Sequence, residues 1–239
     1  LWFGWFCFNS GSEFRVDQME VSAFINTHLA AGFGGMTWLF VEWAHVGKPK
    51  FLGFLTGTIA GLATVTPAVG YISPMSACVI GILASIVCYG AVLFKNKIGL
   101  DDALDVWPVH GVGGMMGMIW LGFFADKAWN PATLWENGIL FGGSGKLLLV
   151  QLISVVFSSI WAFFATLAIF WIVDRITPVR VPEHYERDGL DACIFDEVAE
   201  AHAPLSCTSN PCASWLIADW LIGSLANWLC GSAALRLLW

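Results

Sequence analysis

Residues 105–124 read DVWPVHGVGGMMGMIWLGFF, and no charged side chain follows Asp105 within them. About 20 apolar residues, each rising about 1.5 Å, cross the hydrocarbon core of a bilayer, which is about 30 Å thick. The stretch therefore predicts a membrane-spanning helix over about 104–125. His110 lies inside this helix. Placing a polar group in the membrane is unfavourable, so such a residue is a functional candidate by default.

The rest of the chain is apolar too. Of its 239 residues, 57% are hydrophobic and 12% are charged, whereas a soluble domain carries about 25% charged residues. We therefore predict an all-α, multi-pass integral membrane protein. The predicted spans are 1–12, which is short, and 20–43, 51–72, 73–94, 104–125 and 147–173. A seventh apolar stretch, 215–238, has three open interpretations: a span, an interfacial helix or a non-native extension.

The basic residues predict how these spans are oriented. Loops 44–50 and 95–102 and the tail segment 174–192 together carry seven Lys and Arg, whereas the loops on the opposite side carry three. Because cytoplasmic loops are enriched in basic residues, the first set, including the tail from 174, is predicted to be cytoplasmic. The net charge is −7. This acidic balance argues against a nucleic-acid partner, since nucleic acids are bound by basic surfaces.

The run DDALD places Asp101, Asp102 and Asp105 just before the predicted helix. Carboxylates there can cap free N–H groups and favour the positive end of the helix dipole. We interpret them as structural, with a cation path as the alternative. For His110 a core imidazole and a pore or relay group are both open, and we favour the second. A neutral imidazole both donates and accepts hydrogen bonds, which suits a small polar species.

The first stretch combines aromatic and polar side chains. Phe8 and Ser12 are four residues apart and so share a helix face, and Trp5 lies on or near that face. An aromatic face attracts cations, and a hydroxyl accepts a hydrogen bond. Asn9, in the same stretch, is a candidate pore-lining or structural residue. Taken alone, such a cluster is also typical of a helix core or an interfacial belt.

Four motifs occur in order: GWFCFNSGS at 4–12, AGLATVTPAVGYI at 60–72, DDALDVWPVHGVGG at 101–114 and RVPEHYERDGLD at 180–191. Together they resemble the carboxyl-terminal half of an Amt-type ammonium transporter of the Amt/Rh superfamily, over about residues 1–192. The resemblance implies about six helices of an eleven-helix bundle with two inverted, pseudo-symmetric halves. It also implies a homotrimer with one pore per subunit in the plasma or cytoplasmic membrane, and a cytoplasmic C-terminal tail. Residues 193–239 have no family counterpart that we can place.

The resemblance also implies roles for individual residues. Phe8 matches a gate phenylalanine over the external ammonium site, and Ser12 matches the serine that hydrogen-bonds ammonium there. Trp5 matches a pore-lining tryptophan, and His110 matches the second of two paired pore histidines. The remaining matches are Val106 at an apolar pore-wall position, Thr66 near the pore, and Asp101, Asp102 and Asp105 in a structural acidic cluster.

These matches imply transport of ammonium or ammonia, with methylammonium as an analogue, and no cofactor or metal. Carrying the bare ion through an apolar pore is unfavourable, so we expect recruitment at the aromatic vestibule, deprotonation, and passage past His110. The family's other pore histidine and first gate phenylalanine belong to its first half and are not in this sequence. We therefore expect the chain to be a fragment that does not form a pore alone.

Three further expectations concern regulation and alternatives. Residues 180–191 match a region where a PII-type regulator docks on relatives, although the tail departs from the family pattern after them. A non-transporting sensor or regulatory module on the same fold is the alternative function. A membrane-embedded metal enzyme is disfavoured, because the histidines at 28, 45, 110, 184 and 202 show no ligand-like spacing. We expect a protein that is not an enzyme.

Overall fold

The computed structural model describes residues 1–131 and 136–195, and all regular structure within these ranges is helical. The α-helices are α1 (Trp2–Asn9), α2 (Gln18–Val46), α3 (Phe51–Val65), α4 (Pro74–Ile98), α5 (Gly113–Phe124), α6 (Lys146–Ile176) and α7 (Glu183–Asp188). Short 3-10 helices are η1 (Gly11–Glu13) and η3 (Ile139–Phe141), and π-helical segments are η2 (Trp107–Val112) and η4 (Asp191–Phe195). The predicted seventh stretch, 215–238, lies outside the described residues.

The chain divides into two units, Leu1–Val155 and Val156–Trp239, and the boundary falls within α6. The first unit contains helices α1 to α5 and the first turns of α6. Its two buried clusters include Val65, Ile72 and Ile80 in one and Trp38, Cys88 and Val109 in the other. This unit carries every candidate site residue.

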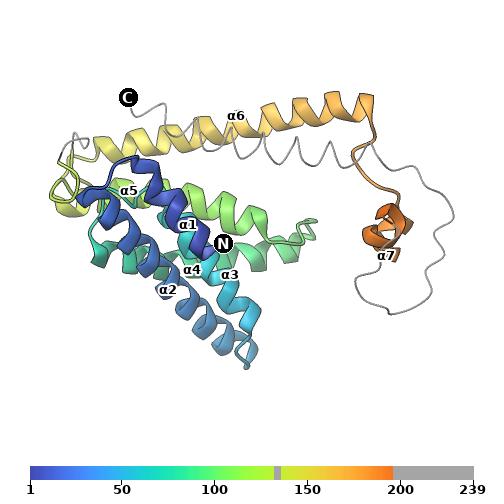
Figure 1. Ribbon diagram of the computed structural model, residues 1–239, viewed down its shortest axis with the longest axis horizontal. Coiled ribbons are helices and arrows are strands. Elements are labelled where there is room, and N and C mark those ends of the chain that lie inside the picture. Colours follow the sequence, from blue (N-terminus) through green and yellow to red (C-terminus); the bar gives the residue numbers. More distant parts are fainter. Residues whose placement is uncertain (132–135, 196–239) are drawn as a thin grey trace. The chain divides into compact units, whose positions relative to one another are not determined.

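Helices α2, α3 and α4 pack against one another (Figure 1). Small residues bring their backbones together around Ala30. A Cβ at Gly61 of α3 would lie 2.2 Å from the Ala30 carbonyl oxygen, and one at Gly81 of α4 would lie 2.5 Å from it. Gly117 likewise places α5 against the carbonyl oxygen of Thr64. Such close backbone approach is typical of helices that pack without a hydrophobic driving force between them.

Local sequence explains where α2 and α4 begin and end. The Asp17 carboxylate accepts hydrogen bonds from the backbone N–H groups of Met19 and Glu20, and the Ser73 hydroxyl accepts one from Ser76. Both helices end at a glycine in the left-handed region, Gly47 and Gly99. These are the preferred N-terminal and C-terminal caps of helices.

Helices α4 and α3 do not end where the predicted spans end. Helix α4 continues to Ile98, past the predicted end at residue 94, because basic side chains in its last turn favour the negative end of the helix dipole. Helix α3 ends at Val65, and turns at residues 66–71 follow it. Pro67 explains this end, because it lacks a backbone donor and disfavours helical geometry in the residue before it.

The segment around His110 is also not one regular α-helix. It opens with the π-helical η2, and α5 starts only at Gly113. The π-helical residues belong to the same apolar run as the α-helical residues that follow them. The apolar run therefore predicts a helix but does not indicate that its first part is π-helical.

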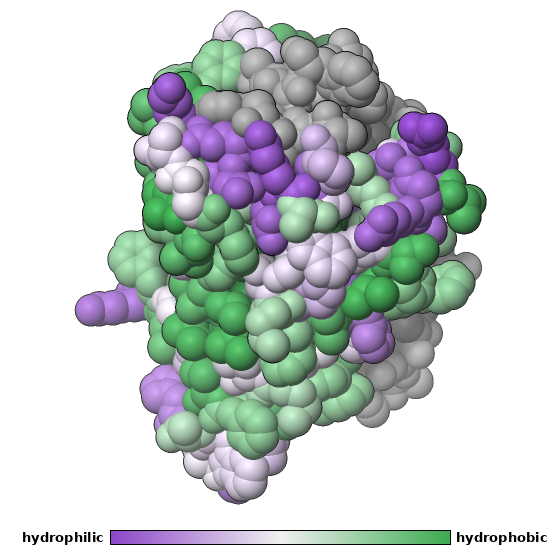
Figure 2. Space-filling view, turned by 90° about the vertical axis from the view of Figure 1, so that its left-hand side faces the viewer, coloured by the Kyte–Doolittle hydropathy of each residue, from purple (hydrophilic) through white to green (hydrophobic). Residues whose placement is uncertain are grey.

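The surface is widely apolar. Among the described helices, α4 and α6 are long and apolar enough to cross a membrane by length and composition. Helix α6 exposes large apolar side chains along its length, among them Ile153, Phe157, Trp161, Phe164 and Trp171. On the face drawn in Figure 2, apolar residues cover most of the area and hydrophilic residues gather in patches toward its upper part. A helix that is apolar all round is typical of contact with lipid or with other apolar helices.

Candidate functional site

Helix α1 presents Trp5 and Phe8 toward residues that come from far along the chain. The Trp5 Nε1–H donates to the Thr66 hydroxyl oxygen at 2.9 Å. The indole stacks on the His110 imidazole, with ring centroids 6.3 Å apart and planes 19° from parallel. The Phe8 ring meets the same indole edge to face, with centroids 5.9 Å apart. Four residues predicted from three separate motifs therefore lie together.

Thr66 holds this cluster through both roles of its hydroxyl. The Oγ1 atom accepts from Trp5 and donates to the Leu62 carbonyl oxygen at 2.7 Å, one turn back in α3. A hydroxyl has one proton to donate and lone pairs to accept with. Because its proton is committed to Leu62, the hydroxyl faces Trp5 as an acceptor and fixes the indole edge.

The cluster lies on an open face of the first unit. The side chains of His110, Phe8 and Ser12 are exposed, and Trp5 is half-buried. Val106, four residues before His110, is also exposed. The Ser12 hydroxyl donates to the Phe8 carbonyl oxygen, which leaves its oxygen lone pairs as acceptors. The exposed part of the cluster thus combines aromatic rings, a hydroxyl acceptor and an imidazole.

Asn9 and His28 make contacts outside this cluster. Asn9 is buried, and its amide donates to the Thr27 hydroxyl at 3.0 Å, which ties α1 to α2. The His28 ring packs against Trp2 and Phe6, with centroid distances of 5.2 and 6.0 Å. Of the two roles considered for Asn9, its contacts correspond to the structural one.

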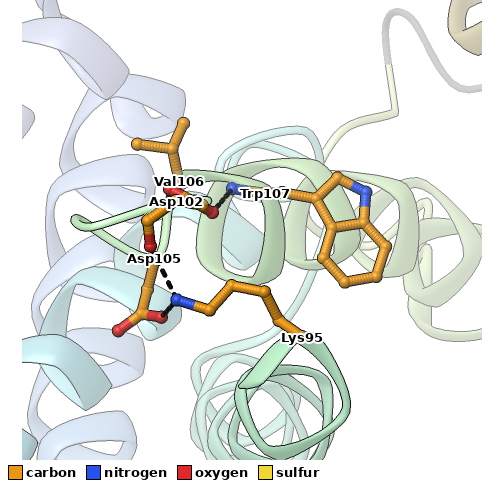
Figure 3. Close-up of polar contacts among 5 residues, drawn as sticks. All are labelled: Lys95, Asp102, Asp105, Val106 and Trp107. Atoms are coloured by element: carbon orange, nitrogen blue, oxygen red, sulfur yellow. Dashed lines mark hydrogen bonds and ion pairs between the residues drawn. The ribbon is translucent and has the colours of Figure 1, made fainter. Parts of the chain in front are cut away.

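The acidic run forms a polar network at the start of η2 (Figure 3). The two carboxylate oxygens of Asp102 accept from the backbone N–H groups of Val106 and Trp107, each at 2.9 Å. The Asp105 carboxylate pairs with the Lys95 ammonium at 2.6 Å. Asp101 is exposed. Asp102 therefore caps η2, and Asp105 anchors the preceding loop to α4.

Lys95 is the residue that sequence reasoning missed, since it entered the prediction only as a loop charge. Its ammonium also donates to the Asp102 carbonyl oxygen at 2.6 Å, and its side chain is buried. The sequence does contain an indication of this ion pair: a lysine follows directly after a long apolar stretch and precedes three aspartates by a few residues. Within 1–131 and 136–195, no group of three or more His, Cys, Asp or Glu side chains could hold a metal ion.

Comparison with known proteins identifies the family of the part of the chain that carries these residues. Residues 1–200 match the model of the Ammonium Transporter Family. The chain is 41% identical over 199 residues to ammonium transporter Amt1 of Archaeoglobus fulgidus, and 40% identical over 200 residues to the ammonium transporter of Bacillus subtilis. Each alignment covers 83% of this chain and 49% of the relative, so the chain spans about half the length of these curated relatives.

Solved structures agree with this result. The crystal structure of Candida albicans Mep2 matches with a TM-score of 0.72 and 37% identity, over 77% of this chain and 41% of that one. A structure described as a sensor Amt protein matches with a TM-score of 0.70 and 31% identity, over 84% of this chain and 47% of that one. The chain belongs to the ammonium transporter family, a family of integral membrane proteins.

Proposed function

We propose that this chain forms the carboxyl-terminal half of an ammonium transporter and supplies one wall of its pore. The observation that carries the proposal is the convergence of Trp5, Phe8, Thr66 and His110 on one open face. The names of the relatives, which are ammonium transporters of about twice the matched length, support the choice of substrate. The complete fold would be an eleven-helix bundle with two inverted halves.

Recruitment of the ion would take place beside Phe8 and Ser12. The negative face of an aromatic ring attracts a cation, and the free lone pairs of the Ser12 oxygen accept a hydrogen bond from it. Trp5 adds a second ring but has its N–H committed to Thr66. The indole is therefore a wall for the substrate, and the hydroxyl acceptor is supplied by Ser12.

Passage would then follow the apolar side chain of Val106 and the imidazole of His110. A bare ammonium ion loses its hydration in such a path, whereas neutral ammonia loses far less, so deprotonation precedes passage. The proton released is passed separately along the pore, with the His110 imidazole as one half of a proton relay, so that ammonia and the proton together carry one charge across. A neutral imidazole accepts a hydrogen bond from ammonia and donates one to it. Stacking on Trp5 keeps the plane of this imidazole fixed.

The placement in the membrane follows the basic loops. The apolar helices would cross the bilayer with loops 44–50 and 95–102 and the tail from 174 in the cytoplasm. Assembly as a homotrimer and docking of a PII-type regulator on residues 180–191 come from the family resemblance.

A second candidate function is sensing without transport. It is favoured by the match to a structure described as a sensor Amt protein. In that case the same face would bind ammonium, and the tail would report occupancy.

Uptake of radiolabelled methylammonium separates the two functions. The protein is expressed from its full native gene in cells that lack their own ammonium transporters. We expect saturable uptake that ammonium competes away, since both cations suit the same vestibule. Binding of ammonium to the purified protein without any uptake would contradict transport and leave the sensor.

A further inference from the structure

Lys95 is a buried cation at the end of α4 whose partners both lie in the loop before η2. Its side chain is 7% exposed. The ammonium donates to the Asp102 carbonyl oxygen and to Asp105 Oδ1, each at 2.6 Å (Figure 3). A buried ammonium without partners is strongly unfavourable, and hydrogen bonds between charged groups are the strong ones. The two contacts therefore hold this loop against the end of α4.

This loop contains a residue in an unfavourable backbone conformation, which the contacts with Lys95 stabilise. Asp105 has a φ of 55°, in the left-handed region that residues other than glycine rarely adopt. Its carbonyl oxygen accepts from the Val109 N–H at 3.0 Å, so its conformation sets the first turn of η2. The Asp102 carboxylate caps the same turn.

The winding of η2 sets the direction of His110. Within this segment the Gly113 N–H donates to the carbonyl oxygen of Pro108, five residues earlier, as in a π-helix. The hydrogen-bonded turn contains one residue more than an α-helical turn, and one inserted residue rotates the flanking parts by about 100° relative to each other. A return to α-helical winding would turn the His110 ring away from the Trp5 indole that it stacks on.

We propose that Lys95 is a positioning residue for His110. Through Asp102 and Asp105 it holds η2 in its π-helical turn, and the imidazole stays stacked on Trp5. The effect on transport rests on the proposed function, whereas the effect on the His110 ring does not. Phe8 and Ser12 belong to α1 and η1, so loss of Lys95 changes the passage step and leaves recruitment as it is.

The transport test uses the full native gene in cells without their own ammonium transporters. Lys95→Met removes the ammonium but keeps the apolar stem, and we expect the maximal uptake rate per folded transporter to fall about tenfold while KM stays within about twofold. Lys95→Arg keeps a donor cation and should restore most of the rate. The matched control is Lys97→Met, in the same turn of α4 but exposed, which should behave as wild type.

The structural test uses the protein made from the full native gene, in phospholipid nanodiscs, and measures the NMR signals of its histidine rings. His110→Gln and His28→Gln assign the two signals. We expect Lys95→Met to shift and broaden the His110 signal and to leave the His28 signal in place. If this variant yields too little folded protein, Asp105→Asn takes its place, since it removes the same ion pair.

An unchanged His110 signal in Lys95→Met, or in Asp105→Asn where it is the variant measured, would overturn the proposal. A change of the His110 signal in Lys97→Met as large as that in Lys95→Met would also overturn it. So would a rise in the KM of Lys95→Met at an unchanged maximal uptake rate. A fall in folded protein with a wild-type rate per transporter would assign Lys95 to stability alone and would also overturn it. If the wild type carries no ammonium, the proposed function fails, and the NMR comparison still decides the role of Lys95.

Discussion

At the scale of single residues, the Thr66 hydroxyl determines how the Trp5 indole is held. It accepts from the Trp5 N–H while it donates to the Leu62 carbonyl oxygen. We expect Thr66→Val to leave the indole N–H unpaired, which costs about 1–3 kcal/mol where that group is buried. Maximal methylammonium uptake should fall, and Thr66→Ser, which keeps the hydroxyl, should retain most of it. Equal rates in the two variants would contradict this role.

The residues of the candidate site were predictable to the extent that each lies in a recognisable motif. Trp5, Phe8, Thr66 and His110 come from three motifs, and the structure places them together. The contact of Asn9 with Thr27 and the ion pair of Lys95 were not predictable. Both join elements whose relative positions only the folded chain defines.

At the scale of elements, the helices of the first unit depend on glycines where backbones meet. A Cβ at Gly81 of α4 would lie 2.5 Å from the Ala30 carbonyl oxygen, whereas Gly90 of the same helix has no atom within 4 Å. We expect Gly81→Ala to lower the free energy of unfolding by about 1–3 kcal/mol through overpacking. Gly90→Ala is the control and should raise it by up to about 1 kcal/mol, since alanine favours helix.

Reversible unfolding of the purified protein in mixed detergent micelles measures this difference. The sign matters more than the size, because the two substitutions are chemically identical and lie in one helix. Equal effects would mean that α2 and α4 do not approach each other closely at Ala30.

An ion pair at the surface joins Arg180 to Glu186 of α7, near the start of the tail. Arg180 donates to both carboxylate oxygens of Glu186, and this hydrogen bonding lowers the pKa of Glu186 below its usual value of about 4.3. A carboxylate with a lowered pKa contributes stability above its unfolded pKa and loses it as the pH falls through its folded pKa. The turn between Arg180 and Glu186 should therefore loosen only in acid, below the usual glutamate range.

Carbon NMR of the glutamate carboxylates follows this titration directly. Arg180→Gln should raise the Glu186 midpoint toward the usual value. Arg187→Gln is the control, because Arg187 pairs with Glu183 instead, and it should leave the Glu186 midpoint in place. A Glu186 midpoint that ignores Arg180→Gln would show that the pair does not form in solution.

The elements themselves were predictable from apolar runs and caps, and their ends were less so. Helix α4 continues through Lys95 and Lys97, which the apolar pattern excluded. The π-helical η2 has the same composition as a regular helix, so neither its winding nor its hold by Asp102 can be derived from hydropathy.

At the scale of the whole molecule, membership of the ammonium transporter family, a family of integral membrane proteins, accounts for the apolar surface. The family model matches residues 1–200, and the relatives are about twice the aligned length. In the proposed function, the face with aromatic, hydroxyl and imidazole groups is one wall of a pore whose other wall comes from the rest of the transporter. The central claim is therefore that His110 lies on the path of ammonia.

The most direct test of this claim is the ammonium-induced current of proteoliposomes that contain the protein made from its full native gene. The wild type should give a saturable current specific for ammonium and methylammonium. His110→Ala should abolish that current or uncouple it from ammonia uptake, while His28→Ala, whose ring packs beside Trp2 and Phe6, should keep it. An unchanged current and uptake in His110→Ala would contradict the account.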